Sequence, residues 1–263
     1  MHQTIAATAV PTDRLSQVDA WIFDLDNTLY PAASDLFTQV RDRMTRFICD
    51  RLALGFDEAR ALQRHYYQTH GTTMLGLMKN DAVDPHEFMD FVHDIDLASV
   101  VPSPLLRDAL VRLPGRRLIY TNASTAHAQR VMQHLGIADL FDGIFDIVAA
   151  EFEPKPGAEA FDRMLQSFAV AARRAAFFED IGRNLEPAAA RGVVTVLVRG
   201  SDVSITGEGV AGGVDFEVDD LADWLHGVSG LLGRHAAVST AQLATGVGVT
   251  VAPDAPPAAS AQA

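Results

Sequence analysis

Short apolar runs that alternate with helical patterns restrict the fold of this chain more than any other feature. The runs are rich in β-branched or aromatic residues and are read as strands: Trp21 to Asp24, Arg117 to Thr121, Ala175 to Asp180 and Val193 to Val198. Helix-like segments follow, such as Ser124 to Leu135, which ends at Gly136. This alternation predicts an α/β fold: a Rossmann-like, doubly wound parallel sheet with helices on both faces.

An interval of about ninety residues separates the first predicted strand from the second. It is too long for an ordinary crossover and too rich in helical pattern for a loop, so we expect an inserted all-helical cap domain. Pro102 and Pro104 mark the return to the core. The expected cap helices are Leu36 to Leu52, Asp57 to His70, Met74 to Lys79 and Pro85 to His93.

The predicted domain organisation has four parts. Residues 1–17 form a flexible N-terminus, 18–31 and 103–226 the core domain, and 32–102 the cap. From about Gly227 the chain loses large apolar side chains and becomes rich in Ala, Gly, Val, Ser, Thr and Pro. Residues 227–263 are therefore predicted to be a disordered tail.

Charge and composition narrow the possible partners. The formal net charge of −13, with no Lys/Arg-rich run, argues against a nucleic-acid polymer as substrate. A lone Cys49 cannot form an internal disulfide. No run has the length of a membrane span, and the N-terminus lacks the pattern of a secretory signal. We expect a cytoplasmic protein, monomer or homodimer, that does not engage a membrane.

Two carboxylates, Asp24 and Asp26, follow the first predicted strand with one residue between them. Such a pair repels, and a bound cation or a shared proton commonly relieves the repulsion. Asp24 is the candidate nucleophile, because a carboxylate can attack phosphorus and form an aspartyl-phosphate. Asp26 is the candidate general acid and base.

Three further segments carry groups that a phosphoryl-transfer site needs. Thr121 and Asn122 end the second strand with a hydroxyl and backbone N–H groups for phosphoryl oxygens. Lys155, between two prolines, offers a positive charge, and Glu179 and Asp180 offer oxygen ligands suited to Mg²⁺. Each residue alone could be a turn, a helix cap or a solvated loop position. Parallel sheets place active sites beyond the carboxyl ends of their strands, so we expect one combined site.

These segments resemble the four motifs of the haloacid dehalogenase superfamily of phosphatases. The resemblance covers about Val18 to Val198 and implies Mg²⁺ bound by the Asp24 carboxylate, the Asp26 backbone carbonyl and the Asp180 carboxylate. Glu179 would then support these ligands without binding the ion. The dehalogenases of the superfamily resemble this chain less, because a phosphate ester needs an acid such as Asp26 and a halide leaving group does not.

Longer matches resemble the pyrimidine 5′-nucleotidase subgroup. They lie at residues 24–31, 71–78, 92–97, 121–123, 134–141 and 178–180. The implied reaction is hydrolysis of a nucleoside 5′-monophosphate, typically UMP or CMP. Three alternatives stay open: a phosphatase for another small phosphomonoester such as a sugar phosphate, a phosphomutase, and a non-catalytic phosphate-binding domain.

Selectivity is expected to come from the cap. Candidate substrate contacts, besides Asn122, combine aromatic rings that can stack on a base with polar groups that can read its edge: Tyr66, Tyr67, His70, Thr73 and Met78. Packing at helical spacing is the competing interpretation. His127, at the start of the helix after Thr121, could approach the phosphate, but we expect it to be solvated.

Overall fold

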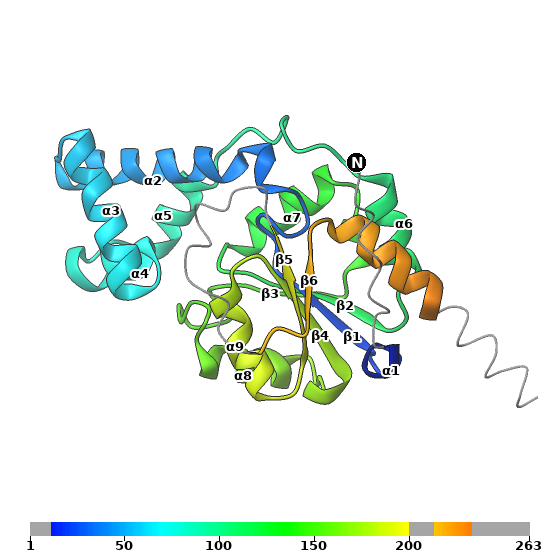
Figure 1. Cartoon of the computed structure of the whole chain (residues 1–263). Coiled ribbons are helices and arrows are strands. Elements are labelled where there is room, and N and C mark those ends of the chain that lie inside the picture. Colours follow the sequence, from blue (N-terminus) through cyan, green and yellow to red (C-terminus); the bar gives the residue numbers. More distant parts are fainter. Residues whose placement is uncertain (1–11, 200–212, 233–263) are drawn as a thin grey trace, which may run out of the picture.

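A parallel sheet forms the centre of the structure (Figure 1). The computed structural model describes residues 12–199 and 213–232. Within these residues six strands pair, all in parallel, in the order β3-β2-β1-β4-β5-β6. The strands are β1 (Ala20–Phe23), β2 (Arg116–Tyr120), β3 (Gly143–Phe145), β4 (Ala175–Glu179), β5 (Val194–Val198) and β6 (Phe216–Val218).

Helices cover both faces of the sheet, as the apolar strands require. Trp21 and Phe23 of β1 pack in the same hydrophobic cluster as α6 (Pro104–Arg112), α7 (Thr125–His134) and a helix at residues 221–232. Ile22 points to the opposite face, which α8 (Ala158–Ser167) and α9 (Glu186–Ala190) cover. Successive side chains of one strand therefore pack into two separate hydrophobic layers, one on each face of the sheet. The predicted fold class is confirmed.

The cap helices stand off one end of the sheet (Figure 1). They are α2 (Leu36–Leu52), α3 (Phe56–His70), α4 (Thr73–Asp81) and α5 (Pro85–Val92), close to the ranges expected from the sequence. Capping side chains fix two of their starts, since Thr72 accepts the N–H of Leu75 and Asp84 accepts the N–H of His86. Helix α2 packs against α3 and α5, and α3 packs against α4.

Both predicted terminal segments are partly ordered, which corrects the sequence-based boundaries. Helix α1 (Thr12–Leu15) lies inside the segment expected to be flexible, because Leu15 is buried in the core. Residues 227–232 continue the helix that begins at 221, and Val228 and Leu232 extend its buried stripe. Residues 1–11 and 233–263 of these two segments lie outside the described residues.

Short elements complete the chain. The 3₁₀ helices are η1 (Ala32–Ser34), η2 (Ala138–Leu140), η3 (Ala172–Arg174) and η4 (Gly182–Leu185). In the part of the chain that the structure describes, no helix combines the length and apolarity needed to cross a bilayer.

Candidate active site

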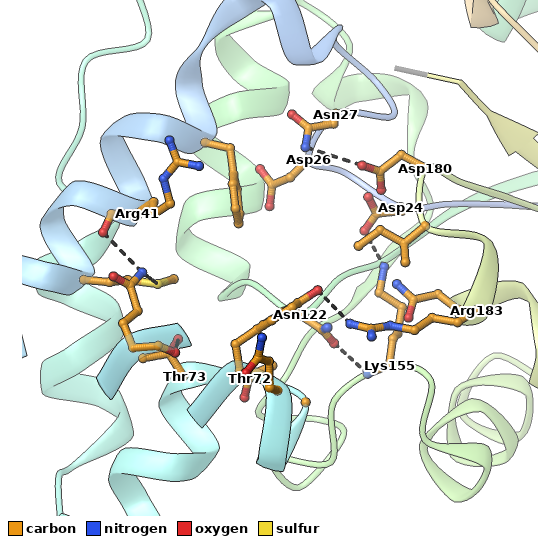
Figure 2. Close-up of a pocket in the computed structure, with 18 of the residues that line it drawn as sticks. Asp24, Asp26, Asn27, Arg41, Thr72, Thr73, Asn122, Lys155, Asp180 and Arg183 are labelled. Atoms are coloured by element: carbon orange, nitrogen blue, oxygen red, sulfur yellow. Dashed lines mark hydrogen bonds and ion pairs between the residues drawn. The ribbon is translucent and has the colours of Figure 1, made fainter. Parts of the chain in front are cut away.

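A cavity of about 510 Å³ lies between the carboxyl ends of the strands and the cap. Figure 2 shows Asp24, Asp26 and Asp180 on its core side, with Arg41, Thr72 and Thr73 across from them on the cap. The register of β1 on β4 pairs Phe23 with Phe178, which brings the next residues of each strand, Asp24 and Glu179, side by side. The sheet itself thus gathers the acidic groups.

Asp24 continues β1 and is held at three points. Its backbone N–H donates to the carbonyl oxygen of Phe178 at 2.9 Å, which extends the ladder to β4. The Thr28 hydroxyl donates to Asp24 Oδ2 at 3.3 Å, and Lys155 Nζ contacts Oδ1. A carboxylate held in this way has a fixed direction toward the cavity.

Lys155 is the buried cation of the site, 4% exposed. Its Nζ also donates to Glu179 Oε2 at 2.6 Å and to the Tyr120 carbonyl at 3.2 Å. Burial opposes the charged form, but Asp24 and Glu179 outweigh it and raise the pKa of Lys155 well above its usual range. Its loop is fixed as well, since the Lys155 N–H donates to Asn122 Oδ1 at 2.9 Å.

Three carboxylates meet beside this single lysine. Ligand oxygens of Asp24, Glu179 and Asp180 lie within 4.8 Å of one another. Burial, followed by repulsion from Glu179, raises the pKa of Asp24 to about 8 and that of Asp180 to about 9. Such an excess of buried oxygen donors fits a hard divalent cation such as Mg²⁺.

Glu179 is less available than its neighbours as a ligand. Its Oε2 accepts from Lys155, and its Oε1 accepts from the Ile181 N–H at 3.2 Å and from Asn184 Nδ2 at 3.0 Å. Asp180 accepts a long hydrogen bond, 3.4 Å from Asn27 Nδ2 (Figure 2). The donor set therefore favours Asp24 and Asp180 as the carboxylate ligands.

Asp26 has a different environment. The Tyr30 hydroxyl donates to its Oδ1 at 2.6 Å, and His127 Nε2 lies 3.2 Å from the same oxygen. Burial alone would raise the pKa of Asp26, but the charge and hydrogen bond of His127, with the bond from Tyr30, lower it to about 2. The two aspartates thus lie in different environments, which move their pKa values in opposite directions.

The structure brings most of the predicted site residues into one cavity. Lining residues foreseen from the sequence are Asp24, Asp26, Asn122, Lys155, Glu179, Asp180, Tyr67 and Thr73. Thr121 is 1% exposed and does not itself line the cavity, and its hydroxyl accepts the N–H of Ala123 at 3.0 Å. The hydroxyl hydrogen of Thr121 is not used in that bond.

Three predicted cap contacts, Tyr66, His70 and Met78, do not line the cavity. Tyr66 is buried between α3 and α4, where its hydroxyl donates to Asp81 at 2.8 Å, and it does not line the cavity. His70 sits beside the Tyr66 ring, with a centroid separation of 5.7 Å, and is also absent from the lining. Thr73 does line the cavity, but its hydroxyl already donates to the Gln63 carbonyl. Helix packing, the competing interpretation, therefore describes Tyr66 and His70.

Further residues that the sequence did not indicate also line the cavity. The half-exposed ring of Phe37 lies there with that of the predicted Tyr67, and the cap adds Arg41, Arg60 and Arg64. Arg183 lines the cavity from the core. Arg183 donates to the Tyr67 hydroxyl at 2.7 Å and so joins core to cap. Tyr67 follows Tyr66 by one residue, so its side chain is rotated by about 100° around the helix axis. The apolar spacing of the sequence did not show which of the two faces the cavity.

Comparisons with known proteins agree with this geometry. Residues 18–192 match the family model described as haloacid dehalogenase-like hydrolase. The chain is 32% identical over 193 residues to Phosphate metabolism protein 8 of Saccharomyces cerevisiae, covering 67% of this chain and 60% of the yeast protein. It is 29% identical over 188 residues to Fructose-1-phosphate phosphatase YqaB of Escherichia coli, covering 68% of this chain and 95% of that protein.

A solved structure shares the fold. The HAD phosphatase from Thermococcus onnurineus superimposes with a TM-score of 0.57 at 16% identity, covering 82% of this chain and 98% of that one. The family match spans more than half of the sequence, and the chain therefore belongs to the haloacid dehalogenase-like hydrolase family. The finer assignment, to pyrimidine 5′-nucleotidases, stays a prediction.

Proposed function

We propose that this chain is a Mg²⁺-dependent phosphomonoesterase that hydrolyses its substrate through an aspartyl-phosphate on Asp24. The observation that carries the proposal is the placement of Asp24 and Asp180 at the carboxyl ends of the neighbouring strands β1 and β4, with Lys155 in contact with Asp24 and Asp26 at the same cavity. A site that only bound phosphate would have no use for Asp26 as a general acid and base.

In the first step an Asp24 carboxylate oxygen attacks phosphorus, and the bond from phosphorus to the ester oxygen breaks. Asp26 gives a proton to the departing oxygen. Because the phosphate dianion adds negative charge to the cavity, it raises the pKa of Asp26 from its low value in the free site. In the second step water attacks the phosphoryl group, Asp26 accepts the proton, and Asp24 is released.

The phosphoryl group needs donors around it. Lys155 holds Asp24 in position and offsets its charge, while Asn122 and the hydroxyl of Thr121 offer donors beside the strand end. Mg²⁺, held by the Asp24 and Asp180 carboxylates and the Asp26 backbone carbonyl, would supply Lewis-acid stabilisation of the transferred group.

As the substrate we propose a nucleoside 5′-monophosphate, with UMP and CMP preferred, so that the nucleoside is the leaving group. Two large aromatic side chains, Phe37 (39% exposed) and Tyr67 (42%), line the cavity and can stack on a planar base. Arg41 and Arg60 present donors that can reach the carbonyl oxygens of a pyrimidine.

A sugar phosphate is the second candidate. The name of the Escherichia coli relative states fructose 1-phosphate as its substrate, and that relative aligns over 95% of its length. The phosphate-binding residues cannot separate the two candidates, since every phosphomonoester shares the phosphate. The aromatic lining of the cap favours the nucleotide.

The test is phosphate release from UMP, CMP, AMP and fructose 1-phosphate, with Mg²⁺ and with chelator, and with Asp24→Asn as the blank. Chelator-sensitive release that is fastest from UMP and CMP would support the full proposal. Faster release from fructose 1-phosphate would replace the substrate but keep the mechanism. A phosphorylated product isomer would indicate a mutase, and no reaction with any ester would favour a binding domain.

A further inference from the structure

Asp26, the general acid and base of the proposed reaction, is held by the protein through one of its two carboxylate oxygens. Tyr30 and His127 both contact Oδ1 of Asp26, at 2.6 Å and 3.2 Å, and neither contact uses Oδ2. The side chain of Asp26 is 22% exposed, at the cavity, whereas that of His127 is 1% exposed. One oxygen of Asp26 is therefore anchored in the protein interior, and the other is left for the substrate.

His127 is in turn contacted by the segment that connects the cap to the core. Its ring stacks on that of His93, with centroids 4.3 Å apart and planes 20° from parallel. His93 follows the last residue of α5, in the connection that leads from the cap back to α6. The hydroxyl of Ser124, the N-cap residue of α7, lies 3.3 Å from His93 Nδ1.

The same connection is fastened to α7. Arg130 donates to the carbonyl oxygens of His93 and Ile95, at 2.8 Å and 2.9 Å. Since His127 and Arg130 both belong to α7, this helix contacts the connection between cap and core at two points. A continuous set of contacts thus runs from the end of the cap through His93 and His127 to Asp26.

We propose that His127 is a positioning residue that fixes the orientation of Asp26, and that His93 holds His127 in place. This inference rests on the proposed phosphatase function. Proton transfer to a leaving oxygen requires a heavy-atom separation of roughly 2.6–3.2 Å. A displacement of about 1 Å can reduce a rate roughly 100-fold, and an Asp26 held by Tyr30 alone can swing about the single shared oxygen.

The experiment compares phenyl phosphate with 4-nitrophenyl phosphate, which have similar shapes but different leaving groups. Nitrophenolate departs without a proton, whereas phenolate benefits from one. A misplaced acid therefore lowers kcat/KM more for phenyl phosphate than for the nitro ester, while general damage to the fold lowers both equally. This contrast separates a positioning role from a structural one, and it does not depend on which natural ester is the substrate.

The variants are His127→Leu, His127→Gln and His93→Leu, with His134→Leu as the matched control. His134 lies on the same helix and contacts the Val100 carbonyl of the same connection at 2.8 Å, but it does not line the cavity. Glutamine can return a donor toward Asp26. Urea unfolding of each variant measures any loss of stability separately.

For His127→Leu we expect kcat/KM with phenyl phosphate to fall at least about 10-fold, and with the nitro ester less than about 3-fold, since acid catalysis contributes about 10²–10⁴-fold. His127→Gln should recover most of the loss, and His93→Leu should show a smaller loss with the same contrast. Equal losses for both esters, or no recovery with glutamine, would overturn the positioning role. A wild-type protein that hydrolyses neither ester would overturn the proposed function, and the role of His127 with it.

Discussion

Lys155 Nζ lies 2.6 Å from Glu179 Oε2, at a point where both side chains are almost fully buried. The same ammonium group contacts Asp24, so one buried cation separates two buried carboxylates. Three distant segments of the chain meet in this contact. Stability and catalysis consequently depend on the same lysine.

Replacing Lys155 with methionine should destabilise the fold by about 3–5 kcal/mol, because two buried carboxylates lose their counter-charge. Urea unfolding in chelator gives the change in the free energy of unfolding. Lys79→Met, at an exposed position of α4, is the control and should stay within about 0.5 kcal/mol. A cost below about 1 kcal/mol for Lys155→Met would contradict the buried ion-pair geometry.

Without metal, stability should fall as the pH rises. Burial and neighbouring carboxylates raise the pKa of Asp24 from 3.8 to about 8 and that of Asp180 from 3.8 to about 9. The folded chain therefore binds more protons than the unfolded chain, and this contribution, complete below about pH 4, is lost as the pH passes 8 to 9.

Thermal unfolding in chelator between pH 6 and pH 9 should show a falling Tm, and Mg²⁺ should reduce the fall because it binds the charged carboxylates. Asp180→Asn should flatten the dependence in chelator. A wild-type Tm that rises over this interval would count against an uncompensated acidic cluster.

Gly76 allows α3 and α4 to pack closely. A Cβ atom built at this position would lie 2.3 Å from Cγ of the Tyr66 ring. Gly76→Ala should therefore cost about 1–3 kcal/mol through overpacking. Gly227→Ala, where a Cβ meets nothing within 4 Å in a helix, should be neutral or stabilise by up to about 1 kcal/mol. Equal effects in urea unfolding would contradict the tight packing at Gly76.

Tyr66 and Tyr67 should respond differently to the loss of a hydroxyl. Tyr67→Phe removes the acceptor for Arg183 between core and cap, so KM should rise about 2–10-fold, a loss of one hydrogen bond. Tyr66→Phe removes a bond to Asp81 within the cap and should lower stability by about 1 kcal/mol with KM unchanged. Steady-state kinetics on the preferred ester, with urea unfolding of both variants, checks this pair. The reverse pattern would place Tyr66 at the substrate.

Much of the core site could be predicted, because its residues sit at the ends of strands that apolar runs define. Asp24 and Asp180 follow such runs directly, and parallel strands bring their carboxyl ends together. The short strands β3 and β6 were not predicted, since three residues carry no readable alternation. Helix α8 was not predicted either, although its buried residues lie at helical spacing.

The cap face and the contacts of His127 could not be predicted for a different reason. Tyr66 and Tyr67 have similar side chains, and only the packing of α4 decides which of them is buried. The contact between His127 and Asp26 joins residues 101 positions apart and depends on how α7 meets the loop after β1. The local periodicity of the sequence does not indicate such long-range contacts, whereas it does indicate where strands end.

The most direct test of the central claim is to locate the phosphoryl group on the chain. Asp26→Asn, which lacks the base for the second step, is mixed with Mg²⁺ and 4-nitrophenyl phosphate, quenched in acid within one turnover and analysed by peptide mass spectrometry. We predict one phosphoryl group on the peptide that contains Asp24, and none when Asp24→Asn is added to the same variant. Label on another residue, or wild-type turnover that persists in Asp24→Asn, would contradict the account.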